Sequence, residues 1–321
     1  MLFPKQCTRL FLAERPNGPI DDTTFKSETV PLSAPSADQV VVRVEYISMD
    51  PGAREWLDER RSYFPSVEIG ETMRAVAIGT VAQGNEQLDE GDIVYGILSW
   101  AEYVVVPAKD LRKLSPPKGT TVVDFLGPLG FTGMTAYFGL LEVGKIKAGE
   151  TLVVSGAAGA TGSLVCQIGK MKGAKVIALA SASKCAYLLD ELGVDVALDY
   201  KSPTFARDFC AAVGYLDVFF DNVGGEILEL ALSRLKTHAR VVLCGAISTY
   251  NRATIQGFIN LDYVSRFAEA ETEIAKWMNE GKLKFKYHIE EGLEQCPQYF
   301  GLLFTGGNNG KLIVKVPNNA T

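Results

Sequence analysis

Short stretches of alternating apolar and polar residues, separated by turn residues, fill the chain from Val30 to about Val106. A period of two places the apolar side chains on one face of an extended chain, which is typical of half-buried β-strands. The clearest examples are VVVRVEYI at 40–47, AVAIGTVAQGNEQ at 75–87, GDIVYGI at 91–97 and AEYVVV at 101–106. This part of the sequence therefore predicts an all-β region.

The pattern changes after SPPKGT at 115–120, where apolar strand-like stretches begin to alternate with helical ones. Such alternation predicts right-handed βαβ units and a doubly wound parallel sheet. We expect strands at 150–156, 175–180, 194–200, 216–223, 240–246 and 254–260, and helices at 133–144, 162–173, 184–193, 226–235 and 266–281. The tail from residue 285 predicts a strand, a helix and a last strand that return to the β-rich region.

Composition argues for a globular protein that acts on small molecules. The chain has 321 residues, of which 47% are hydrophobic, and a net charge of −6, so no excess of basic residues is available for nucleic acid. Charges at Lys5, Arg9, Glu14 and Arg15 interrupt any apolar run near the amino terminus, which argues against a signal peptide or a spanning helix. We expect a cytoplasmic protein with neither nucleic-acid nor membrane partners.

Metal-binding patterns are missing from the sequence. The six cysteines are scattered without a C-x-x-C pair, and His238 and His288 are the only histidines. Zinc sites need several Cys and His residues at short, regular spacings. No metal site is therefore expected.

A glycine-rich turn follows the predicted strand at 150–156. It reads Gly156-Ala157-Ala158-Gly159-Ala160-Thr161-Gly162 and opens a predicted helix, which is the context of a dinucleotide fingerprint. Gly159 would let the backbone approach a pyrophosphate, and Gly162 would let the helix pack closely on the strand. Ala157 replaces the first glycine of the fingerprint, so an ordinary strand-to-helix turn is the alternative interpretation.

The end of the next predicted strand bears on the choice of cofactor. Where an Asp or Glu would bind the ribose of NAD, the chain has Ser181, Ser183 and Lys184. Hydroxyls and an ammonium favour a 2′-phosphate, which a carboxylate would repel, so NADPH is the expected cofactor. The alternative is that the serines cap the following helix and that Lys184 is solvated.

Several linked motifs resemble the prostaglandin reductase and 2-alkenal reductase branch of the medium-chain dehydrogenase/reductase superfamily. They are LGFTGMTAYFGLLEVGKIKAGETLVVSGAAGATG, FDNVGGEILELAL, CGAISTYN and GGNNGKLIVKV, with YISMDPGAR and RRSYFPSVEIGETMRA in the amino-terminal third. The resemblance implies a GroES-like β domain at 1–118, completed by 286–321, and a Rossmann NADP-binding domain at 119–285. It also implies a cofactor site in the cleft between the domains and a homodimer.

The resemblance also implies site residues. Lys184 and Tyr200 match the residues at the 2′-phosphate end of the cofactor. The other cofactor-binding positions are Gly159, Ala160, Thr161, Gly162, Asn222, Cys244, Gly245, Ala246, Ile247, Ser248, Thr249, Tyr250, Phe258, Ile259, Asn260 and Asn308. Many of them follow predicted strands, at the edge where a doubly wound sheet binds its ligand.

Three departures from the family pattern concern the substrate side. The usual M-P-G-L-T-A-Y reads FTGMTAY at 131–137 and so lacks its proline. Gly52 stands where relatives have an aromatic residue, and a Pro/Gly-rich loop of the family is missing between Asn251 and Arg252. The substrate range is therefore the property that this sequence defines least.

Without zinc, the chemistry that the resemblance implies is reduction of an activated carbon–carbon double bond. Hydride delivered to the β-carbon of an enal or enone leaves an enolate, which modest hydrogen-bond donors can stabilise. We expect Tyr250 to hold the enolate oxygen, with Tyr46, Tyr63, Tyr137 and Tyr263 as rival phenols. An NADPH quinone reductase, a non-catalytic NADPH-binding relative and an enoyl reductase of a polyketide assembly line remain alternatives.

Overall fold

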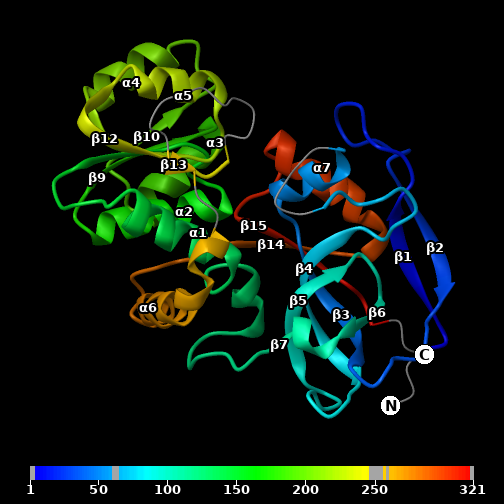
Figure 1. Ribbon diagram of the computed structural model, residues 1–321. Coiled ribbons are helices and arrows are strands. Elements are labelled where there is room, and N and C mark those ends of the chain that lie inside the picture. The colour runs from blue at the N-terminus through cyan, green and yellow to red at the C-terminus, as the bar shows by residue number, and fades with distance from the viewer. Residues whose placement is uncertain (1–3, 60–64, 246–255, 258–259, 319–321) are drawn as a thin grey trace. The chain divides into compact units, whose positions relative to one another are not determined.

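The structure is a computed structural model that describes residues 4–59, 65–245, 256–257 and 260–318 (Figure 1). The chain divides into two compact units. A β unit comprises Met1–Pro116, Thr121–Leu126 and Tyr287–Thr321, and an α/β unit comprises Pro117–Thr120 and Gly127–Lys286. A parallel sheet with helices in one unit and a mainly antiparallel sheet in the other confirm the predicted fold class.

The β unit is built around a sheet in the order β14-β15-β3-β4-β5-β7, and β6 also pairs with β3. The strands of this unit are β1 (Gln6–Leu12), β2 (Phe25–Pro31), β3 (Gln39–Ser48), β4 (Arg74–Gln83), β5 (Ile93–Ser99), β6 (Tyr103–Pro107), β7 (Arg112–Lys113), β14 (Tyr287–Glu291) and β15 (Lys311–Lys315). β15 runs antiparallel to β3, so the carboxy-terminal tail completes this sheet. The antiparallel pair of β1 and β2 was not predicted, because neither strand shows a regular alternation.

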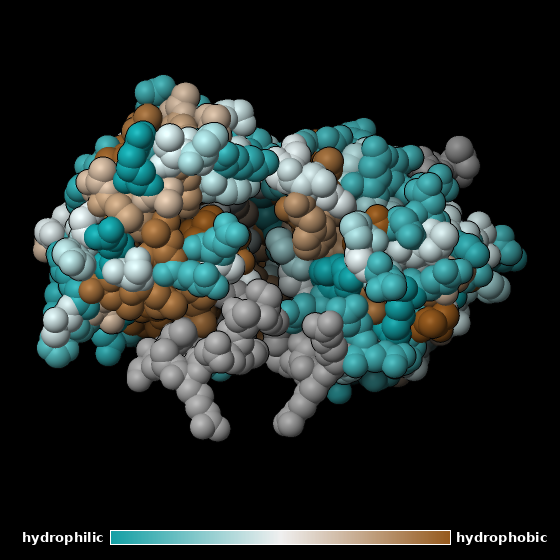
Figure 2. Space-filling model, turned by 90° about the horizontal axis from the view of Figure 1, so that it is seen from above, coloured by the Kyte–Doolittle hydropathy of each residue, from teal (hydrophilic) through white to brown (hydrophobic). Residues whose placement is uncertain are grey.

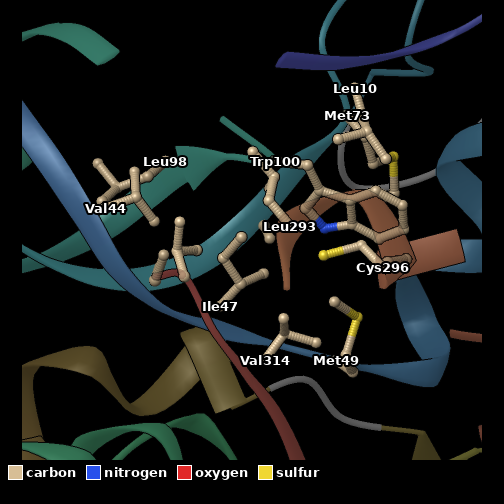
Figure 3. Close-up of a cluster of buried hydrophobic side chains, with 14 of the residues drawn as sticks. Leu10, Val44, Ile47, Met49, Met73, Leu98, Trp100, Leu293, Cys296 and Val314 are labelled. Atoms are coloured by element: carbon tan, nitrogen blue, oxygen red, sulfur yellow. The ribbon is translucent and has the colours of Figure 1, made fainter. Parts of the chain in front are cut away.

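Trp100 lies at the centre of the core of the β unit (Figure 3). Its ring is 1% exposed and lies 4.9 Å from the ring of Phe25 and 5.9 Å from that of Phe300, measured between centroids. Phe300 belongs to α7 (Cys296–Thr305), which also buries Cys296 in the same cluster. The tail therefore contributes a helix to this core as well as strands to its sheet.

The α/β unit contains a parallel sheet in the order β10-β9-β8-β11-β12-β13. The strands are β8 (Thr151–Val154), β9 (Lys175–Ala180), β10 (Val196–Asp199), β11 (Leu216–Asp221), β12 (Leu235–Leu243) and β13 (Gln256–Gly257). The order runs outward from β8 to one edge and from β11 to the other. The point where it reverses, between β8 and β11, is where such sheets bind ligands.

Helices cover both faces of this sheet (Figure 1). They are α1 (Phe131–Phe138), α2 (Ala160–Met171), α3 (Ala182–Ala186), α4 (Phe205–Val213), α5 (Gly225–Leu232) and α6 (Phe267–Asn279). Alternate strand residues pack with α4 and α5, as Val153 and Phe219 do with Phe209. α2 packs against the other face, where Gly169 lies close to the side chain of Leu152. Burial on both faces explains the almost continuous apolar strands.

Several predicted elements differ from the structure. The helix expected at 226–235 ends at Leu232, because β12 already begins at Leu235. The strand expected at 254–260 is described only as Gln256–Gly257, and a 3₁₀ helix begins at Asn260. α4 was not predicted, although Phe209 and Val213 place one apolar face on the sheet.

Hydrophobic residues are more prominent on the surface of the α/β unit, on the left of Figure 2, than on that of the β unit. Two exposed apolar side chains lie at the carboxyl edge of the sheet. Tyr200 follows β10 and is 40% exposed, and Val223 follows β11 and is 52% exposed. This edge of the sheet is where a doubly wound fold binds its ligand.

Tyr187, which follows α3, gives a prediction on alkaline stability. Burial, and then the charge of Glu191, raise the pKa of Tyr187 from 10.0 to about 12. Its pKa is higher in the folded state, so the unfolded chain loses this proton first, and stability is lost as pH rises from about 10 to 12. We expect Tyr187→Phe to match the wild type in thermal unfolding at pH 8 and to lose less stability than the wild type at pH 11.

The aromatic ring and its contact with the Lys286 ammonium, which lies 5.0 Å from the ring centroid, are retained in Tyr187→Phe. Tyr215→Phe is the matched control, because Tyr215 is 58% exposed. Equal alkaline losses in the wild type and Tyr187→Phe would contradict the expectation.

Within the described residues, none of the helices combines the length and the apolar character that crossing a membrane requires.

Candidate functional site

The glycine-rich turn connects β8 to α2 as predicted. Gly156 has a φ of +57°, a conformation that side chains with a Cβ rarely adopt. Gly159 is the N-cap of α2, and no side chain caps this end, so the first N–H groups of the helix are available to an anion. A Cβ at Gly162 would lie 2.4 Å from the carbonyl oxygen of Gly156, so only glycine permits this close packing.

The surroundings of Ala157 show why an alanine can replace the first glycine of the fingerprint. Its side chain is completely buried, and its N–H donates to the carbonyl oxygen of Leu179 in β9. The methyl group therefore fills part of the core and does not crowd the turn. The uncapped start of α2 after this turn is where a pyrophosphate could bind.

Basic and hydroxyl side chains gather where β9 and β10 end. The two strands are neighbours, with Ala180 beside Asp199, so Ser181 and Tyr200 leave the sheet side by side. Ser181 is the N-cap of α3, but its hydroxyl makes no capping bond and lies 3.4 Å from that of Ser183. The alternative that Ser181 caps the helix through its side chain is therefore wrong.

Lys184 and Lys201 form a pair of cations at this edge. Burial, and then the positive charge of Lys201, lower the pKa of Lys184. The ammonium of Lys201 also lies 5.8 Å from the centroid of the Tyr200 ring. Lys201 was not predicted, although its position directly after Tyr200 at the end of β10 could have indicated it. Two neighbouring ammonium groups fit a phosphate dianion, which relieves their repulsion.

A buried hydrogen-bond network lies where the strand order reverses. The Ser155 hydroxyl donates to Oδ1 of Asp221 at 2.7 Å and accepts from the N–H of Asn222 at 2.8 Å. The Asn222 side chain donates to the carbonyl oxygen of Ser155 at 2.7 Å. These bonds join the turn after β8 to the turn after β11, and Asn222 lies at this junction as the sequence predicted for a residue that follows β11.

Cys244 and Gly245 follow β12, and their N–H groups donate to the carbonyl oxygen of Asp221. Burial, and then the charge of Asp221, raise the pKa of the Cys244 thiol to about 12, so this cysteine is not a reactive thiolate at neutral pH. The predicted residues Ala246, Ile247, Ser248, Thr249, Tyr250, Phe258 and Ile259 lie outside the described residues, as do Asn251 and Arg252, between which the shortened loop was inferred.

Asn260 is connected to the first turn of α1. Its side-chain amide donates to the carbonyl oxygen of Phe131 and to the hydroxyl of Thr135, both at 3.0 Å. Gly130 is the N-cap of α1, which begins at Phe131 without the proline of the family pattern. These two bonds connect Asn260 to the start of α1. They use the amide nitrogen of its side chain, so the side-chain oxygen is the group that could bind a cofactor.

The rival phenols differ in their surroundings. The hydroxyl of Tyr137 donates to Glu273 at 2.5 Å, and burial and this bond raise the pKa of Tyr137, which makes it a weaker acid. Tyr263 stacks on Phe138 with the ring planes 6° apart. Tyr46 is in β3, and Tyr63 lies outside the described residues. The hydrogen bond from Tyr137 to Glu273 therefore connects α1 to α6.

Two predicted features of the substrate and cofactor side lie in the β unit. Asn308 donates from its amide to the carbonyl oxygen of Gly310 at 2.9 Å. The next residue of this motif, Lys311, is 2% exposed and pairs with Asp50. Gly52 lies in a short 3₁₀ helix at Pro51–Leu57, directly after Asp50. The Asn308 motif and the Gly52 segment are therefore joined by an ion pair in which the Lys311 side chain is buried and that of Asp50 is partly exposed.

Comparisons with known proteins agree with this arrangement. A family described as the N-terminal domain of oxidoreductases matches residues 8–114, and one described as zinc-binding dehydrogenases matches residues 160–271. The NADPH-dependent curcumin reductase of Escherichia coli (strain K12) is 36% identical over 333 residues, which cover 96% of either chain. Prostaglandin reductase 1 of Rattus norvegicus is 33% identical over 318 residues, 92% of this chain and 94% of that one.

The chain belongs to the prostaglandin reductase and 2-alkenal reductase branch of the medium-chain dehydrogenase/reductase superfamily. The solved structure of CurA from Vibrio vulnificus in complex with NADPH superposes with a TM-score of 0.91 at 31% identity, covering 97% of this chain and 99% of that one. Although one matching family is described as zinc-binding, no three His, Cys, Asp or Glu side chains are placed to hold a metal ion in the described parts of this reductase.

Proposed function

We propose that this reductase transfers hydride from NADPH to the β-carbon of α,β-unsaturated aldehydes or ketones without zinc. The observation that carries the proposal is the 33–36% identity, over more than nine-tenths of the chain, to relatives named curcumin reductase and prostaglandin reductase. The glycine turn at α2 and the Lys184–Lys201 pair support NADPH as the cofactor. We further infer that the protein is cytoplasmic and forms a homodimer. A monomer mass in light scattering at micromolar concentration would contradict the homodimer.

Bound NADPH supplies the hydride. The protein's contribution is to bind and orient: the first N–H groups of α2 hold the pyrophosphate, and Lys184, Tyr200 and Lys201 hold the 2′-phosphate. Asn222, Cys244 and Gly245, with residues 246–250, 258–260 and Asn308, complete the proposed cofactor site. Reduction of the double bond leaves negative charge on the carbonyl oxygen of the substrate, where a phenol can donate a hydrogen bond.

The first experiment follows NADPH absorbance with purified protein and a panel of 2-alkenals, enones, one quinone and one saturated ketone, with and without a chelator. We expect oxidation with the alkenals and enones only, at rates that the chelator does not change. Turnover confined to the quinone would favour a quinone reductase. Saturable NADPH binding without any turnover would favour a non-catalytic relative.

Tyr250 is the proposed donor to the developing enolate oxygen. Removing one such donor typically lowers kcat roughly 100- to 1,000-fold. We expect Tyr250→Phe to lower kcat/KM for an enone by at least roughly tenfold while leaving the Kd of NADPH within about twofold, because the hydroxyl acts mainly in the transition state.

Tyr137→Phe is the matched control. It removes a hydroxyl that donates to Glu273, so its effect should fall on thermal stability and leave kcat/KM nearly unchanged. Unchanged kcat/KM in Tyr250→Phe would exclude the proposed role of Tyr250.

A further inference from the structure

Asp221 is a completely buried carboxylate at the carboxyl end of β11. Its Oδ1 accepts three hydrogen bonds, from the Ser155 hydroxyl at 2.7 Å, from the N–H of Val223 at 3.0 Å and from the N–H of Gly224 at 2.9 Å. Three donors from the turns after β8 and β11 converge on this one oxygen, so the carboxylate of Asp221 is held in place at the junction of the two turns.

Among the described residues, none forms an ion pair with the carboxylate of Asp221. Its Oδ2 is buried and has no hydrogen-bond partner among them. Burying a charge without a counterion costs folding free energy. Such groups are therefore found mainly where their electrostatic field contributes to function.

The position of Asp221 suggests such a function. It ends β11, and Ser155 follows β8, so the pair joins the two strands between which the strand order reverses. A dinucleotide lies across this point of a doubly wound sheet. The nicotinamide is the part of the cofactor whose charge changes, because hydride donation leaves it as a cation.

We propose that Asp221 is an electrostatic positioning residue that favours the oxidised, positively charged nicotinamide over the reduced, neutral one. This inference depends on the NADPH-dependent reaction proposed above. The carboxylate stabilises the charge that develops on the ring during hydride donation. It repels the cofactor phosphates equally in both redox states, so its specific effect is on the ratio of the two affinities.

The test is to measure the Kd of NADP⁺ and of NADPH by fluorescence or calorimetric titration in the wild type and in Asp221→Asn. We expect the ratio of the Kd of NADP⁺ to that of NADPH to rise roughly five- to thirtyfold in Asp221→Asn. Unit charges about 8 to 15 Å apart give this range at an effective dielectric constant near 20. A purely structural role would weaken both affinities by the same factor.

Two controls separate charge from geometry. Asp217→Asn removes a carboxylate from the opposite end of the same strand, where Asp217 pairs with Lys236 at 2.6 Å, and should leave the ratio unchanged. Ser155→Ala removes one hydrogen bond to Asp221 but keeps the charge, so it should change both affinities alike. A ratio within twofold of the wild type in folded Asp221→Asn overturns the proposal.

A measurement on the wild type covers the case in which Asp221→Asn does not fold. NADP⁺ is compared with an analogue in which an uncharged benzamide ring replaces the nicotinamide. We expect at least fivefold tighter binding of NADP⁺, and equal affinities would overturn the proposal. If alkenes are reduced but the affinity ratio does not respond, this inference alone fails. If neither form of the cofactor binds, the proposed function fails and the inference fails with it.

Discussion

Lys184→Ala is expected to weaken the binding of NADPH by roughly 10- to 100-fold while changing the affinity for NADH by less than about threefold. Loss of one hydrogen bond to a charged group is worth about 1.5–3 kcal/mol, and about 1.4 kcal/mol corresponds to tenfold in Kd. Lys184 lies in α3, which follows the carboxyl end of β9, and only NADPH would present a 2′-phosphate there. Titration of each variant with NADPH and NADH measures the two affinities.

Lys201 makes this prediction more specific. Lys201 follows the end of β10, the strand beside β9, and its charge lowers the pKa of Lys184 after the larger effect of burial. We therefore expect both ammonium groups to act on the same phosphate. The double variant Lys184→Ala/Lys201→Ala should bind NADPH and NADH almost equally. Lys26→Ala, in the exposed part of β2, is the matched control and should behave like the wild type. Equal losses for NADPH and NADH in Lys184→Ala would mean that Lys184 does not recognise the 2′-phosphate.

Gly162→Ala should lower the unfolding temperature by roughly 5–10 °C and weaken NADPH binding at least roughly tenfold. The added Cβ would lie 2.4 Å from the Gly156 carbonyl oxygen and 2.8 Å from the Ala157 Cα, and both are backbone atoms. Overpacking of this kind costs about 1–3 kcal/mol or more, and about 1 kcal/mol shifts the midpoint by about 2–4 °C in a domain of this size. The glycine turn must move to make room, which disturbs the pyrophosphate site.

Two other glycines provide matched controls for thermal unfolding and NADPH titration. A Cβ at Gly169, in the same helix, would meet the end of the Leu152 side chain, which can rotate, so Gly169→Ala should affect stability less and cofactor binding little. A Cβ at Gly301 in α7 would meet nothing within 4 Å, so Gly301→Ala should be neutral or stabilising. If Gly162→Ala binds NADPH as tightly as Gly169→Ala, the close approach at Gly162 does not matter for the site.

The site could be predicted from the sequence only in part. The turn at 156–162 was recognisable because glycines at fixed spacing between a strand and a helix have few other uses. The positions of Asn222 and Cys244 at the ends of strands followed from the same pattern of elements. Lys201 and Asp221 were missed because each acts together with a residue that is distant in the sequence. Lys201 acts with Lys184, and Asp221 is hydrogen-bonded to Ser155.

By itself, the sequence determined the fold class, the glycine turn and the family of this protein. These features rest on local periodicity, on residues that only particular backbone geometries need, and on motifs tens of residues long. Only the tertiary structure decided that Ser181 makes no side-chain cap, that Tyr137 is committed to Glu273, and that the Asp221 carboxylate is buried with an unpaired oxygen. The physical reason is that burial, hydrogen-bond partners and electrostatic fields arise between segments that only folding brings together.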